Sequence, residues 1–164
     1  MGSMEIPLLN TEGYLSAINS YNTLHALIQE RHDGLKKAIT TGDVEGFLSY
    51  YSDDIRFCDW THNLYLIGKT QLRTFFSDIF AKLAPITIHD ATLNCTSPDF
   101  VTWEFEKRFT VVGPMPHLGR EPGQKIKKRA CLVQHWRLER TAEGKLVWRI
   151  WKENDYGQRD QRDE

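Results

Sequence analysis

Hydrophobic residues recur at helical spacing over the first part of the chain. From Tyr14 to about Ile39, apolar positions fall three or four residues apart on one stripe, which predicts an amphipathic helix. Gly42 ends this pattern, because glycine readily adopts the conformation that closes a helix. Asp43 can then cap a short second helix that runs to Tyr51.

A short strand and a third helix follow in the middle of the chain. The strand has about six residues, comes after a polar turn at residues 52–54 and ends at Asp59. A brief loop leads to Gly68, which opens a helix over about residues 70–83, and Pro85 stops that helix. A carboxylate at the end of an apolar strand is costly to bury without a partner or a task. Asp59 is therefore the first candidate for chemistry.

The second half of the chain changes to strand-like patterns. Residues 86–95, 99–112, 125–140 and 145–156 are rich in β-branched and aromatic residues and are separated by turn signals. Helices first and a meander of strands afterwards predict an α+β domain, in which the helices pack on one face of an antiparallel sheet. We expect this single domain to span residues 14–156.

The remaining segments are expected to lie outside this domain or at its surface. Residues 1–13 combine a cloning remnant with an N-terminal arm, and the charged residues 157–164 are expected to be a disordered tail. The segment 113–124 holds three prolines and three glycines, so we expect a loop. It is either the tip of a surface hairpin or a lid over whatever the sheet encloses.

Three of the predicted strands have an apolar face that is interrupted by one polar residue. These residues are Asp59, Lys107 and Gln134, and aromatic side chains such as Trp103 and Phe105 lie on the same faces. An unpaired polar group in a dry core costs roughly 1–3 kcal/mol, whereas a partly wet cavity tolerates it. We therefore expect a cavity lined by aromatic side chains, although Lys107 can also extend to water from the end of its strand.

The last strand has two faces that can both be covered. One is purely apolar and the other becomes charged towards its end, so helices can cover one face and a second subunit the other. Five tryptophans exceed what one core of this size needs, which favours a ligand pocket, a dimer interface or both. The apolar face holds Leu146, Trp148 and Ile150, and the other holds Val147, Arg149, Trp151, Glu153 and Asp155.

Composition and charge exclude several classes of protein. The 164 residues carry a formal net charge of −1, which argues against sequence-independent nucleic-acid binding. No apolar run approaches the roughly 18 residues of a membrane span. Three scattered cysteines fit reduced thiols in a cytosolic protein, and the sequence shows neither metal-ligand spacing nor a phosphate-binding glycine loop. We therefore expect a cytoplasmic protein without a metal or cofactor.

Three stretches of sequence resemble a known superfamily. Residues 40–60, TTGDVEGFLSYYSDDIRFCDW, are similar to ketosteroid isomerases, as are QHWRL at 134–138 and GKLV at 144–147. Over residues 22–156 the order of elements resembles the nuclear transport factor 2-like superfamily, which includes those isomerases, SnoaL-like polyketide cyclases, scytalone dehydratase and limonene epoxide hydrolase. The resemblance implies a cone-shaped α+β barrel with three N-terminal helices packed on a curved antiparallel sheet. It also implies a homodimer through the outer face of the sheet.

The resemblance implies roles for individual residues as well. Asp59 falls on the isomerases' catalytic base and Gln134 on their oxyanion-hole acid, whose hydrogen bond a glutamine amide can replace. Leu35 takes the place of their second donor, a tyrosine, so that donor is missing. His89 falls on a catalytic histidine of scytalone dehydratase, and the second pocket histidine of that enzyme falls near Thr110.

Two histidines are candidate partners for Asp59. Besides His89, His62 lies just past Asp59 and can reach the same cavity, where a histidine beside a carboxylate suits proton transfer. We therefore expect an isomerase, cyclase or dehydratase that acts on an apolar small molecule in polyketide- or terpenoid-like biosynthesis. The alternative is a ligand-binding or dimerisation module of the same fold. The predicted catalytic residues are Asp59, His62, His89 and Gln134, and the predicted substrate-binding residues are Trp60, Tyr65, Trp103, Phe105, Lys107, Trp136 and Trp151.

Overall fold

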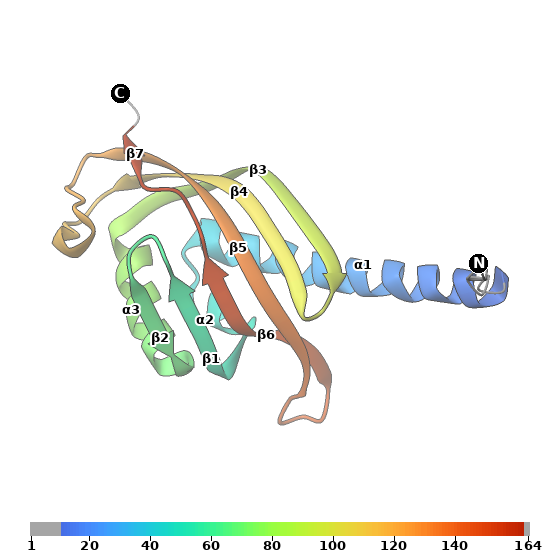
Figure 1. Ribbon diagram of the computed structural model, residues 1–164. Coiled ribbons are helices and arrows are strands. Elements are labelled where there is room, and N and C mark those ends of the chain that lie inside the picture. The colour runs from blue at the N-terminus through green and yellow to red at the C-terminus, as the bar shows by residue number, and fades with distance from the viewer. Residues whose placement is uncertain (1–10, 163–164) are drawn as a thin grey trace, which may run out of the picture.

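Three helices pack against the inner side of a curved sheet (Figure 1). The computed structural model describes residues 11–162, and it describes side chains from residue 20 to residue 161. The helices are α1 (Thr11–Thr41), α2 (Val44–Leu48) and α3 (Gly68–Lys82), and a 3-10 turn, η1, spans Pro116–Leu118. The strands are β1 (Tyr51–Asp59), β2 (Leu64–Ile67), β3 (Leu83–Ser97), β4 (Phe100–Val111), β5 (Lys125–Arg140), β6 (Leu146–Asp155) and β7 (Gln161–Arg162).

The strands form one mixed sheet in the order β2-β1-β6-β5-β4-β3, with β7 paired to β5. Neighbouring strands run antiparallel except β1 and β6, which run parallel. The sheet is curved but not closed, so β2 and β3 are its edges (Figure 1). The predicted α+β cone is confirmed, but the sheet is not purely antiparallel. A long stretch of chain separates β1 from β6, and only a hairpin requires the antiparallel direction.

The long first helix has a packed half and a projecting half. Its buried side chains begin at Ile28 and continue through Leu35, where the helix contacts β3. Towards its N-terminus, α1 projects beyond the sheet (Figure 1). The helix begins at Thr11, earlier than the predicted start at Tyr14. The predicted cloning remnant and most of the predicted arm, residues 1–10, lie outside the described part of the chain.

Glycines set two of the predicted helix boundaries. Gly42, with φ of 67°, ends α1, and Gly68, with φ of 80°, opens α3, both in the left-handed region that favours glycine. Asp43 caps α2 as predicted, because its carboxylate accepts a hydrogen bond of 2.9 Å from a backbone N–H of the first turn. The second helix ends at Leu48, before its predicted end, and Tyr51 already begins β1.

Two short strands were not predicted. The four residues of β2 pair with β1 at the edge of the sheet, where Tyr65 and Ile67 are exposed, and they are too few for a clear alternation. The tail predicted to be disordered from residue 157 contains β7, and Asp160 accepts two hydrogen bonds from Arg120. Over residues 157–162 the structure thus differs from that prediction, because a charged composition does not show that a residue of opposite charge lies in a distant loop.

The proline- and glycine-rich loop at residues 113–124 folds back against the core. Met115 is fully buried and exchanges backbone hydrogen bonds of 2.9 and 3.2 Å with Arg120. Leu118 packs on the same hydrophobic cluster. The loop therefore forms a wall of the domain and is not a loose hairpin tip. Within residues 11–162, none of the helices has the length and hydropathy that a membrane-spanning helix needs.

Candidate active site

Two adjoining chambers lie between the helices and the inner face of the sheet. The apolar chamber has a volume of about 80 Å³ and the charged chamber about 60 Å³. Phe57, Phe76, Lys107 and Asp155 belong to the walls of both. Aromatic residues dominate the wall of the apolar chamber, namely Phe47, Tyr51, Phe57, Phe76, Phe80, Trp103, Phe105 and Phe109. The prediction of a cavity lined by aromatic side chains is thus confirmed.

Asp59 and His62 form a hydrogen-bonded pair in the wall of the charged chamber. Asp59 ends β1 and is buried, and its Oδ2 lies 2.8 Å from Nδ1 of His62. Its Oδ1 accepts the backbone N–H groups of Thr61 and His62, at 2.9 and 3.1 Å. These contacts hold the turn after β1 in place, and the turn brings the side chains of Asp59 and His62, three residues apart, together.

The pair has a defined arrangement of protons. Burial raises the pKa of Asp59, but the hydrogen bond from His62 and the charge of Lys128 outweigh burial and bring the pKa to about 2. Because Asp59 is ionised and can only accept, the shared proton sits on Nδ1 of His62. In the neutral imidazole, Nε2 of His62 then carries a lone pair, and Nε2 has no hydrogen-bonding partner in the described part of the chain. This arrangement suits a histidine that accepts a proton from a bound molecule.

Other charged groups surround this pair. Lys128 is 1 % exposed, and burial, together with nearby Lys107, lowers its pKa to about 8. Arg120 from the loop at 113–124 donates to both oxygens of Asp160, at 2.6 and 2.9 Å. The sequence analysis missed Lys128, although it shares the alternation of Ala130 on β5 and could have been found by extending that face.

A second polar group lies at the apolar chamber. Glu153 on β6 is 3 % exposed, and its Oε2 accepts hydrogen bonds from Tyr51 Oη at 3.1 Å and from Gln134 Nε2 at 2.6 Å. The Oε1 of Gln134 in turn accepts from Nε2 of His32, at 2.7 Å, and from the indole N–H of Trp136, at 3.2 Å. The network thus connects α1, β1, β5 and β6 across the core.

Burial favours the neutral form of Glu153 in this second group, whereas Asp59 in the first is charged. Burial, with a contribution from Asp155, raises the pKa of Glu153 to about 7 against the hydrogen bonds from Gln134 and Tyr51. Burial also lowers the pKa of His32 to about 4, so His32 is a neutral imidazole at pH 7. Its Nδ1 has no hydrogen-bonding partner among residues 20–161. His32 and Tyr51 were not among the predicted site residues.

A β-bulge explains why Glu153 was missed. His135 pairs with Lys152 and Trp136 pairs with Ile150, so Trp151 is an extra residue on β6. The extra residue shifts the alternation, and Ile150 and Glu153 face the same side although a regular strand would put them on opposite sides. Trp151, Glu153 and Asp155, which were predicted to share one face of the strand, therefore do not: Trp151 lies on the opposite face from Glu153 and Asp155.

Three predicted residues lie elsewhere than expected. Trp151, predicted to line the pocket, contacts the ring of His135 on the other face of the sheet, with ring centres 5.8 Å apart. Gln134 and Trp136 are buried behind the cavity and belong to the wall of neither chamber. Gln134 therefore fixes Glu153 instead of facing a bound molecule. Leu35, at the position of the missing tyrosine, is fully buried in the core.

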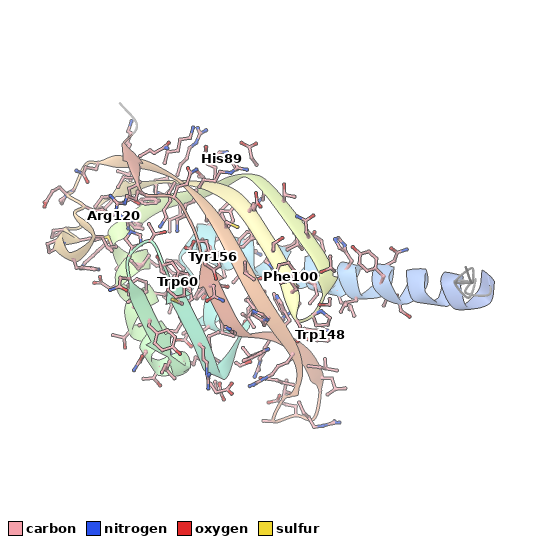
Figure 2. All side chains as sticks on the ribbon, viewed as in Figure 1. Trp60, His89, Phe100, Arg120, Trp148 and Tyr156 are labelled. Atoms are coloured by element: carbon pink, nitrogen blue, oxygen red, sulfur yellow. The ribbon has the colours of Figure 1, made fainter. Side chains whose placement is uncertain are left out.

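Three others lie at the surface. His89 is exposed, and its Nε2 lies 2.9 Å from the hydroxyl of Thr87, so the structure does not bring it to Asp59. Trp60 and Tyr65 are 60 % and 57 % exposed. Trp60 stacks on Tyr156 with ring planes 7° apart, and Figure 2 shows both at the front of the sheet, well away from His89.

The remaining predicted residues lie where the sequence placed them. Trp103, Phe105 and Lys107 line the apolar chamber, and Lys107 also reaches the charged chamber. With Asp59 and His62, they form the part of the site that the sequence predicted. Among the described side chains, no group of three or more His, Cys, Asp or Glu residues could hold a metal ion.

Comparison with known proteins identifies the family. The sequence pattern of the SnoaL-like domain family matches residues 28–152, more than half of the chain, so the chain belongs to that family. No curated protein matches the sequence. The predicted resemblance to SnoaL-like proteins is therefore confirmed.

Solved structures share the fold at low sequence identity. A proposed polyketide cyclase from Xanthomonas campestris pv. campestris is 14 % identical, with a TM-score of 0.62 over 77 % of this chain and 87 % of its own. A proposed scytalone dehydratase from Novosphingobium aromaticivorans is 9 % identical, with a TM-score of 0.61 over 89 % and 92 %. A type 2 hexachlorocyclohexane dehydrochlorinase is 14 % identical, with a TM-score of 0.62 over 87 % and 90 %. At identities this low, the structural similarity establishes the shared fold alone, and the reaction must be argued from the residues of the site.

Proposed function

We propose that this member of the SnoaL-like family is a cofactor-independent isomerase, cyclase or dehydratase that moves protons on a small apolar substrate inside the cone. The hydrogen-bonded Asp59–His62 pair carries this proposal, because it combines an ionised carboxylate, an oriented imidazole and an adjoining apolar chamber. The similar fold of a proposed polyketide cyclase supports a role in the biosynthesis of polyketide-like compounds.

In the proposed reaction, Nε2 of His62 accepts a proton from a carbon of the substrate. Asp59 holds the imidazole in position and stabilises the positive charge that forms on it. Buried Lys128 provides a positive potential for the negative charge that develops on the substrate. General base catalysis of this kind contributes roughly 10²–10⁴-fold to the rate.

The size of the cavity limits the substrate. The two chambers, of about 80 and 60 Å³, together approach the roughly 150 Å³ that accommodates benzene in a protein core. We therefore propose a substrate with about one ring.

The test is deuterium exchange at the carbon next to the carbonyl of one-ring ketones such as 2-cyclohexen-1-one, followed by proton NMR in D₂O. The Asp59→Asn variant should lose at least about 10²-fold of the exchange rate. Asp53→Asn is the matched control, because Asp53 lies on the same strand with an 89 % exposed side chain. Exchange by Asp59→Asn at the wild-type rate would contradict the mechanism.

A non-catalytic ligand-binding module is the second candidate function. Neither Gln134 nor Leu35 lines either chamber, so neither donates a hydrogen bond to a negative oxygen of a bound molecule. This favours the module. The same experiment separates the two candidates, because binding of the ketone without exchange above the buffer rate would favour the module.

We also propose a homodimer through the outer face of the sheet. His135 and Trp151 lie on that face, and Phe100, whose neighbour Val101 points into the core, is 52 % exposed. Gel filtration at micromolar concentration should show about twice the chain mass of 19.1 kDa. Elution as a monomer would contradict the dimer.

A further inference from the structure

The two oxygens of Glu153 have different surroundings. Oε2 accepts two hydrogen bonds, from Tyr51 and Gln134. Oε1 has no hydrogen-bonding partner among the residues that the structure describes, and the Glu153 side chain forms part of the wall of the apolar chamber. The chamber therefore contains a carboxyl oxygen that is free to contact a bound molecule.

The groups around Glu153 favour a proton on that free oxygen. Tyr51 from β1 and Gln134 from β5 both donate to the other oxygen, Oε2. Tyr51 keeps its proton for this bond, because burial holds its pKa well above the ordinary value. Lys107 from β4 and Asp155 from β6 are the charged groups in the same chamber wall, and they act on Glu153 in opposite directions. With aromatic side chains over most of the remaining wall, the neutral carboxyl is favoured and its hydrogen lies on Oε1.

We propose that Glu153 is a second proton-transfer residue, whose Oε1 donates its proton to an oxygen of the substrate in the apolar chamber. This inference rests on the proposed function, in which His62 takes a proton from carbon. The C–H bond breaks and its proton moves to Nε2 of His62, while its electron pair forms a C=C bond. The π electrons of the neighbouring C=O then move to oxygen, which takes the proton of Glu153. The products are an enol, an imidazolium and a carboxylate, so charge and protons balance.

This assignment narrows the substrate class. The substrate carries a carbonyl oxygen on an otherwise apolar skeleton, because the oxygen must reach Glu153 while its ring contacts aromatic side chains such as Trp103 and Phe105. The two chambers share Lys107 and Asp155 in their walls and so adjoin, and the scheme requires a molecule that extends through both, from Glu153 to His62. Gln134 is a positioning residue in this scheme, because it touches Glu153 and not the cavity.

Infrared spectroscopy of bound 2-cyclohexen-1-one tests the hydrogen bond without turnover. In the wild-type protein below pH 7, the carbonyl stretch should shift to lower wavenumber than in buffer, and the shift should decrease as the pH rises through about 7. Glu153→Leu should abolish the shift, and Glu153→Gln should keep part of it, because its amide still donates. A wild-type shift that survives in Glu153→Leu would overturn the proposal.

Exchange rates distinguish this inference from the proposed function. Glu153→Leu should lower deuterium exchange into the ketone by roughly 10²-fold, with partial rescue in Glu153→Gln, which also controls for folding. Asp59→Asn should lose exchange but keep the carbonyl shift. If Glu153→Leu exchanges at the wild-type rate while Asp59→Asn does not, the role of Glu153 is wrong and the proposed function stands. If the wild type shows the shift but no exchange, the proposed function fails and the hydrogen bond of Glu153 stands.

Discussion

The two polar groups of the cavity each contain a carboxyl group, but the pKa of that carboxyl is lowered in one group and raised in the other. Asp59 accepts two backbone N–H groups and a histidine, lies near Lys128, and has a pKa of about 2. Glu153 accepts only neutral donors in a mostly aromatic chamber, and its pKa is about 7. The comparison shows that the donors and the nearby charges, and not the carboxyl group itself, decide in which direction each pKa is shifted.

The largest expected effect comes from the charged group. His62→Gln removes the lone pair that accepts the substrate proton, so exchange into a one-ring ketone should fall by roughly 10²–10⁴-fold. His117→Gln, an exposed position in the loop at 113–124, is the control and should keep the wild-type rate. Equal rates in the two variants would show that the Asp59–His62 pair does not transfer the proton.

A large loss of stability is expected from the neutral group. Gln134→Leu removes one buried hydrogen bond from each of His32, Trp136 and Glu153, so the free energy of unfolding should fall by about 3 kcal/mol or more. Urea unfolding measures this change. His135→Leu, on the next residue and the other face, should change it by less than about 1 kcal/mol. A small effect of Gln134→Leu would mean that the network adds little to the core.

The pH dependence of stability sharpens the contrast. The pKa of Glu153 is about 7 in the folded protein and its ordinary value is 4.5. Below pH 4.5 both states bind the proton. Between pH 4.5 and about 7 the folded state binds it and the unfolded state does not, so stability falls as the pH rises and levels off above 7. The free energy of unfolding of the wild type, minus that of Glu153→Gln, should therefore fall by up to about 3 kcal/mol between pH 4.5 and pH 7.5.

His32 and Asp59 change the stability of the protein over other ranges of pH. The depressed pKa of His32 makes stability fall as the pH drops from about 6.5 to about 4, which opposes the slope of Glu153 but cancels in the difference between the two proteins. For Asp59, stability should be lost only as the pH falls from about 4 towards 2. A difference between wild type and Glu153→Gln that is constant from pH 4.5 to 7.5 would contradict the neutral state of Glu153.

The smallest effect is expected outside both groups. His89→Gln changes an exposed side chain that contacts the hydroxyl of Thr87, so the free energy of unfolding should change by less than about 0.5 kcal/mol and exchange should stay at the wild-type rate. A marked loss of exchange would bring His89 back into the site and would require a rearrangement of β3.

Much of the fold could be predicted from the sequence, because helix and strand periodicities are local properties. The stripe that buries Ile28 and Leu35 and the alternation of Val101, Trp103 and Phe105 mark the inner faces without any knowledge of their partners. Asp59 could be identified for the same reason, since its strand and its turn are continuous in sequence. His62 could be predicted as its partner because it lies only three residues further along the chain.

The tertiary structure alone decided which other polar residues reach the cavity. The extra residue at Trp151 turned Glu153 inward, and a bulge depends on how two strands pair, which alternation along one strand does not show. His32 and Gln134 are 102 residues apart, and their hydrogen bond exists only because α1 crosses the sheet at that point. The sequence thus determined the cone and placed Asp59 and His62 together. The packing of distant segments determined the surroundings of Glu153, because burial and hydrogen-bond partners are properties of the folded chain.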